Sequence, residues 1–132
     1  MTIDGLTSKQ SRHAPKETMD RLVAAVRAKG MTVFARIDHA AGAADAGLAL
    51  RPTELLIFGN ARGGTPLMQA MQTIGIDLPL KALVWQDAPG NTWLSWNEPR
   101  WLAQRHGSSQ AIDAPLGALS AALAALAEAS VS

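Results

Sequence analysis

The stretch LLIFGNARGGTPLM, residues 55–68, decides the fold, because in it an apolar run passes through glycines into a helix start. Its first four residues, 55–58, are apolar on both faces of an extended chain, which is typical of a central strand. Thr65 is a favourable N-cap residue, and Pro66 suits the first helical position. The stretch therefore predicts a central strand, a glycine turn and a helix that starts at Thr65.

The glycine turn has two interpretations. Gly59 and Gly64 have the spacing of a P-loop, but Thr65 and Pro66 stand where its lysine and hydroxyl must be. The sequence thus excludes a nucleotide-hydrolysing P-loop. A plain strand-to-helix turn explains the residues best. The alternative is an anion site, in which Arg62 and the free N–H groups of the helix start bind a carboxylate or phosphate.

Hydrophobic periodicity predicts the other elements on both sides of this stretch. The segment of small residues at 39–47 is interpreted as a loop, and the Ala-Pro-Gly at 88–90 as a hairpin turn. The order β-α-β-β-α-β-β-α-α predicts an α+β fold with a mixed or antiparallel sheet and helices mainly on one face. Strands are predicted at 8–13, 31–38, 53–60, 80–87 and 91–97, and helices at 15–29, 66–75, 99–106 and 115–129.

The predicted domain organisation has three parts. Residues 1–14 form a leader that includes a short first strand, and residues 15–107 form the core α+β domain. Residues 108–132 form a linker and a C-terminal amphipathic helix. That helix carries a narrow leucine seam, made of Leu116, Leu119, Leu123 and Leu126.

Composition limits the function classes. Twelve basic and eleven acidic residues give a net charge of +1 without a basic block, which argues against nucleic acid binding. The absence of cysteine leads us to expect a cytoplasmic protein. No segment is expected to span a membrane, and no secretory signal is recognised. The chain has no cysteine, and its three histidines show no metal-ligand spacing, so neither a metal nor another cofactor is predicted.

Two pairs of polar residues are candidates for chemistry. Asp38 and His39 end a strand and open a loop. His39 could act there as a general base with Asp38 beside it, although a structural loop histidine is the simpler interpretation. Asp77 and Lys81 flank Leu-Pro-Leu and are expected either to form a salt bridge, the favoured interpretation, or to line a polar pocket. His106 is interpreted as a helix-terminal residue that interacts with the helix dipole.

Four tryptophans lie in the second half of the chain, at positions 85, 93, 96 and 101. Trp93 and Trp96 are expected on opposite faces of one strand. At least one of them therefore faces solvent unless a helix, a ligand or a second subunit covers it. Core packing is the default interpretation, and an interface or a pocket wall is the alternative.

The chain resembles domain-of-unknown-function family 302 over residues 17–107. The resemblance rests on FARIDHAAGA (34–43), LRPTELLIFGN (50–60), GTPLM (64–68), GIDLPLKALVW (75–85) and RHG (105–107). It implies an α+β fold of the TATA-binding-protein-like class, a homodimer and no DNA binding. The chain departs from the family where NARGG replaces a turn of the NPKAG type, so that Arg62 keeps the charge but Ala61 loses a stiffening proline.

The resemblance implies no reaction, so three functions are weighed. The first is a dimeric module that binds a small polar or anionic ligand. Assembly through the tryptophans and the terminal helix is the second, and an enzyme with His39 as base and Asp38 or Asp77 as partner is the third. The residues expected to bind the ligand are His39, Asn60, Arg62, Gly64, Thr65, Asp77 and Lys81.

Overall fold

The computed structural model describes residues 2–107 and 110–132. One five-stranded sheet forms the centre of the fold, in the order β1-β5-β4-β3-β2, and every neighbouring pair is antiparallel. The predicted α+β class is confirmed, and the sheet is wholly antiparallel in the described chain. The strands are β1 (Leu6–Ser11), β2 (Thr32–Asp38), β3 (Thr53–Gly59), β4 (Leu80–Gln86) and β5 (Thr92–Asn97).

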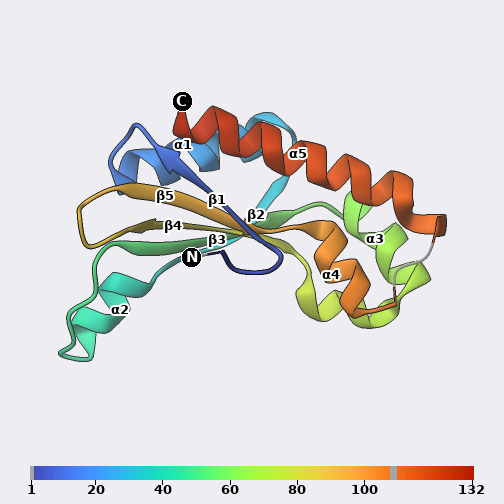
Figure 1. The fold of residues 1–132 in the computed structure, drawn as a ribbon, viewed down its shortest axis with the longest axis horizontal. Coiled ribbons are helices and arrows are strands. Elements are labelled where there is room, and N and C mark those ends of the chain that lie inside the picture. The colour runs from blue at the N-terminus through green and yellow to red at the C-terminus, as the bar shows by residue number, and fades with distance from the viewer. Residues whose placement is uncertain (1, 108–109) are drawn as a thin grey trace.

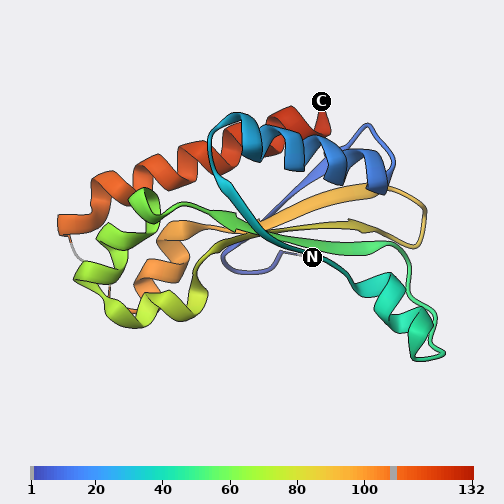
Figure 2. The same ribbon diagram turned by 180° about the vertical axis from the view of Figure 1, so that it is seen from behind.

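The two long helices, α1 and α5, lie side by side on one face of this sheet (Figures 1 and 2). Helix α1 connects the two edge strands, β1 and β2, and therefore crosses the sheet. The shorter helices lie beyond the ends of the strands (Figure 1). The helices are α1 (Pro15–Ala28), α2 (His39–Asp45), α3 (Ala61–Ala70), α4 (Pro99–Arg105) and α5 (Asp113–Val131), with 3-10 turns η1 (Gln72–Asp77) and η2 (Gln110–Ile112).

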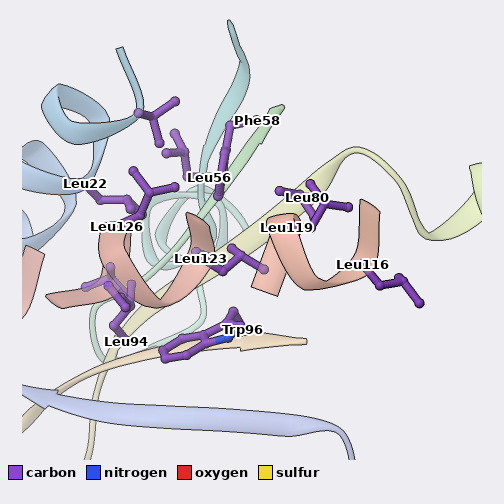
Figure 3. Packing of buried hydrophobic residues seen from close by; sticks show 14 of the residues in the cluster. Leu22, Leu56, Phe58, Leu80, Leu94, Trp96, Leu116, Leu119, Leu123 and Leu126 are labelled. Carbon is purple, nitrogen blue, oxygen red and sulfur yellow. The ribbon is translucent and has the colours of Figure 1, made fainter. Parts of the chain in front are cut away.

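The core fills the space between the sheet and the two long helices. Side chains alternate along each strand, so Leu56 and Phe58 of β3 point toward the helices and are fully buried. Figure 3 shows these two residues in one cluster with the leucine seam of α5. All four residues of that seam are buried in this core: Leu116, Leu119, Leu123 and Leu126.

The chain ends belong to the same packed unit as its middle. Strand β1 pairs with β5 along its whole length, from Leu6 opposite Asn97 to Ser11 opposite Thr92. Helix α5 packs against α1 and contributes to the shared core. The start of the predicted linker, residues 108–109, lies outside the described residues.

Two local predictions are wrong. The segment predicted as a loop at 39–47 contains helix α2, which starts at His39 because Asp38 caps it: the carboxylate accepts a hydrogen bond from the Ala41 amide at 2.9 Å. Alanine is the best helix former, and this outweighs the glycines in the segment. Helix α3 starts at Ala61, not at Thr65, and Pro66 lies inside it.

The last helix meets a criterion that no segment was expected to meet. By length and hydropathy alone, the segment Gln110–Val131 could cross a membrane, although no segment was expected to. This is weak evidence, because a core helix of a soluble protein meets the same criterion. Here the leucine seam of α5 packs into the protein's own core.

The opposite face of the sheet carries neither α1 nor α5 (Figures 1 and 2). We call it the helix-free face. Trp85 and Trp93 lie opposite each other on it and stack, with ring centroids 6.1 Å apart, whereas Trp96 is buried in the core. The predicted split of Trp93 and Trp96 between two faces is confirmed. The residues of the helix-free face include Ala35, Ile37, Leu55, Ile57, Lys81, Leu83, Trp85 and Trp93.

Candidate functional site

The connection between β3 and β4 forms the main candidate site. These strands are antiparallel neighbours with Phe58 opposite Leu80, so the chain that leaves the sheet at Gly59 must return to the same place. In between it forms helix α3 and the 3-10 turn η1. Asn60 begins α3 as its N-cap, because its Oδ1 accepts a hydrogen bond from the Gly63 amide at 2.7 Å.

A cavity of about 240 Å³ lies beside this connection. Among its lining side chains, that of Asn60 is the one polar group, so the site is mainly apolar. Two residues that were expected to bind a ligand, Asn60 and Gly64, line it. The other lining residues are Met31, Phe34, Gly59, Ala61, Met68, Gly75, Leu78, Pro79, Leu80 and Leu119.

The start of α3 offers fewer free amides than the glycine-rich sequence suggested. The Gly63 amide donates to the Asn60 side chain, and the Gly64 amide donates to the Asn60 carbonyl oxygen at 3.2 Å. Arg62 and Thr65 are exposed on the first turns of the helix. The plain turn is therefore a capped helix start that also forms one wall of the cavity.

Asp77 does not bridge to Lys81, contrary to the favoured interpretation. Its carboxylate accepts hydrogen bonds from Arg105 Nη1 at 3.0 Å and from His106 Nε2 at 2.6 Å. Lys81 lies on the helix-free face, in register with Ile57. Partial burial acts to raise the pKa of Asp77, but the hydrogen bond from His106 and the charge of Arg105 outweigh it and hold that pKa below its ordinary value.

His106 connects Asp77 to a residue that the sequence analysis missed. Its Nδ1 lies 2.9 Å from Thr73 Oγ1, so the three side chains form a continuous hydrogen-bonded row, Thr73–His106–Asp77. His106 is the C-cap of α4, as its predicted position required, and its side chain is only 9% exposed. Nothing in a single polar threonine on a 3-10 turn signals this contact, which depends on how α4 packs against η1.

The pair Asp38 and His39 lies elsewhere in the molecule. Asp38 pairs with Glu54 at the start of β3, whereas Asn60 follows the end of that strand. The seven residues of β3 separate the two regions by roughly 20 Å at the usual rise of about 3.3 Å per residue. His39 is exposed on α2 and does not line the cavity, and Asp38 is committed to capping that helix.

The described residues contain no group of three or more His, Cys, Asp or Glu side chains placed to hold a metal ion. The arrangement found is an apolar cavity bounded by a capped helix start. A separate row of polar side chains joins η1 to the end of α4.

The family described as "Domain of unknown function DUF302" matches residues 7–126. The chain belongs to this family. A crystal structure of an uncharacterised DUF302 protein from Bacillus stearothermophilus has the same fold, with a TM-score of 0.85 over 96% of this chain and 98% of that one, at 20% identity. At that identity the likeness concerns the fold alone.

Two curated relatives come from Brucella. The "Fluoride-specific ion channel FluC 1" proteins of Brucella suis and Brucella abortus are each 51% identical to this chain over 115 residues. The match covers 87% of this chain but only 45% and 43% of those proteins. The chain thus spans less than half the length of these relatives.

The sequence segments that carry the DUF302 resemblance meet in two places. The GTPLM and GIDLPL segments, together with the end of LLIFGN, supply lining residues of the cavity. The RHG segment meets the Asp of GIDLPL through Arg105 and His106. The DHAAGA segment lies at the other end of β3, so within one chain the expected ligand-binding residues do not form a single site.

The Asp77 contacts predict a difference in acid stability. A carboxylate whose pKa is lowered in the folded state stabilises the fold above its unfolded pKa, near 3.8, and loses that contribution as the pH falls through the folded pKa. Asp77→Asn removes this contribution. The free energy of unfolding, measured with urea at neutral and at acid pH, should therefore decrease less between the two pH values for Asp77→Asn than for the wild type.

The exposed Asp45 of α2 provides the control, because Asp45→Asn should follow the wild-type pH dependence. An Asp77→Asn protein that loses as much unfolding free energy as the wild type over the same pH range would contradict the assignment.

Proposed function

We propose that this DUF302 chain is a small-molecule-binding module whose ligand occupies the cavity between α3, η1 and α5. The observation that carries the proposal is the cavity itself, whose lining residues come from the quoted segments of the family resemblance, except Met31, Ala61 and Leu119. Its volume of about 240 Å³ exceeds the ~150 Å³ of an engineered apolar cavity that binds benzene. A ligand of one or two rings, or a short alkyl chain, fits this space.

The lining determines the chemistry of the ligand. The sequence suggested a small polar or anionic ligand, but the apolar walls favour a mainly apolar body with one polar or anionic end. The polar end is expected at Asn60, whose Oδ1 accepts a hydrogen bond from the Gly63 amide while its Nδ2 donates none to another described residue. Arg62, an exposed residue in the first turn of the same helix, is the nearest basic residue in sequence to Asn60 and is expected to contribute its charge to that end.

A cavity-filling variant tests this proposal. A Cβ at Gly64 would contact Leu78 and Met68 at 3.7 Å, so the larger side chain of Gly64→Leu should enter the cavity without a backbone clash. Titration with 1-anilinonaphthalene-8-sulfonate, an aromatic anion, should give saturable fluorescence with the wild type and at least tenfold weaker binding with Gly64→Leu.

Ala70→Leu is the matched control, because Ala70 is exposed on the same helix. It should bind the probe as the wild type does. Equal binding by all three proteins, or no saturable binding by the wild type, would overturn the cavity as the binding site.

We propose that the module is a homodimer that acts in the cytoplasm, with its helix-free face as the interface. That face carries half-buried apolar side chains from β3, β4 and β5 and continues into Ile37 on β2, which is 40% exposed. Apolar area of this kind is unusual on a monomer and typical of protein interfaces. An assembly role based on the terminal helix is not supported, because the leucine seam of α5 is used inside the chain.

Sedimentation velocity tests the dimer. A lysine placed on the interface must be desolvated, so Ile37→Lys should shift the wild-type dimer to a monomer. Ala24→Lys, on the exposed side of α1, should leave the dimer unchanged. A wild-type monomer, or a dimer that Ile37→Lys does not weaken, would refute this interface.

The names of the Brucella relatives suggest a protein with which the module acts. We propose that it acts beside a membrane channel for fluoride and that occupation of the cavity changes the activity of that channel. The support is the 51% identity to proteins named as fluoride channels, of which this chain matches less than half.

A chimera tests this setting. The matching segment of the Brucella suis protein is replaced by this chain, either wild type or Gly64→Leu, and fluoride efflux from liposomes is followed with a fluoride electrode. The two chimeras should differ in efflux rate, whereas the Ala70→Leu chimera should match the wild type. Identical efflux rates from the three chimeras and from the Brucella suis protein with this segment deleted would exclude a role of the module in channel activity.

A further inference from the structure

A second site lies on η1, outside the cavity. Thr73, His106 and Asp77 form a row in which Thr73 Oγ1 is 2.9 Å from His106 Nδ1 and His106 Nε2 is 2.6 Å from Asp77 Oδ2. The order of groups is hydroxyl, imidazole, carboxylate. A hydroxyl next to a base that is oriented by a third group is the arrangement of an activated nucleophile.

The carboxylate determines which imidazole nitrogen carries the proton. An ionised carboxylate only accepts hydrogen bonds, so the 2.6 Å contact places a proton on His106 Nε2. In the neutral ring Nδ1 is then unprotonated and accepts the hydrogen bond of the Thr73 hydroxyl. Thr73 thereby has a general base within reach of its proton.

The three side chains of the row differ in their exposure to solvent, and this difference suits a nucleophile with a shielded base. The side chains of His106 and Asp77 are 9% and 17% exposed, whereas Thr73 is an exposed residue. The base and its orienting carboxylate are therefore shielded from water while the hydroxyl is open to a substrate. Ile76, three residues after Thr73 and so on the same face of a 3-10 turn, is 73% exposed and offers an apolar contact.

This site is distinct from the cavity. Gly75 of η1 lines the cavity, whereas Thr73, Asp77 and His106 do not. Thr73 and Ile76 are three residues apart and share a face of the 3-10 turn, so they point in a different direction from Gly75. A ligand in the cavity does not reach the Thr73 hydroxyl, so the two sites are tested separately.

We propose that Thr73 is an acyl-accepting nucleophile, with His106 as its general base and Asp77 as the positioning residue. The substrate class is a carboxylic ester with a small apolar acyl group, which lies against Ile76. Thr73 Oγ1 forms a bond to the carbonyl carbon and its proton passes to His106 Nδ1. The ester C–O bond then breaks, and the leaving alcohol takes that proton.

The second half of the reaction uses water alone. His106 Nδ1 accepts a proton from a water molecule, which attacks the acyl-threonine carbonyl, and the Thr73 oxygen leaves with that proton. The free acid and the original threonine result, so the cycle balances without another reactant. Arg105 Nη1 donates to both oxygens of Asp77, at 3.0 Å each, and so helps to hold the carboxylate that orients His106.

The test is acylation of the full chain by p-nitrophenyl acetate. Release of p-nitrophenol should show a burst, and peptide mapping by mass spectrometry should place one acetyl group on Thr73. Thr73→Val should abolish the burst, and Thr73→Ser should keep it. Thr32→Val, which replaces an exposed threonine on β2, should react as the wild type. His106→Gln should slow acylation by ~10²-fold or more, as removal of a general base does.

Urea unfolding of each variant separates chemistry from folding. Thr73→Val and His106→Gln proteins that unfold like the wild type yet fail to acylate would establish the role. Acetyl groups found only on lysines, or acylation that persists in Thr73→Val, would overturn it. If His106→Gln fails to fold, the pair Thr73→Val and Thr73→Ser still decides the outcome.

Discussion

The register between β3 and β4 is the constraint on which the rest of the structure depends. Phe58 and Leu80 are paired across neighbouring strands, although a helix and a 3-10 turn separate them in the sequence. The connection must leave and re-enter the sheet at one point. It therefore folds back beside the end of the sheet, and the cavity lies between this connection and Leu119 of α5. The walls of the cavity are thus a consequence of a strand pairing.

The elements with strong periodicity could be predicted from the sequence. Residues 55–58 indicated a central strand and the leucine seam indicated a buried helix face, because burial on a sheet or in a core demands those patterns. The prediction failed where local chemistry offers two choices. Thr65-Pro66 fits a helix start, but Asn60 caps the helix earlier and Pro66 lies inside it, although a proline there cannot donate an i→i−4 hydrogen bond.

The candidate site was predictable only in part. Asn60 and Gly64 adjoin the strand end that the sequence identified, and they line the cavity. The contacts of Asp77 were not predictable, because they join η1 to the end of α4 across 28 and 29 positions of the sequence. Such a contact depends on how two elements pack, and no residue spacing encodes it. The apolar character of the cavity escaped prediction for the same reason, since Met31, Phe34 and Leu119 come from other elements.

The central claim is that a ligand occupies this cavity, and methyl NMR on methionine-labelled protein tests it most directly. Met31 and Met68 line the cavity, whereas Met19 is fully buried elsewhere in the core and serves as an internal reference. With hexanoate as the probe, an apolar chain with an anionic end, the account predicts saturable shifts of the Met31 and Met68 methyl signals and none for Met19. Shifts that include Met19 equally, or no shift at Met31 and Met68, would contradict it.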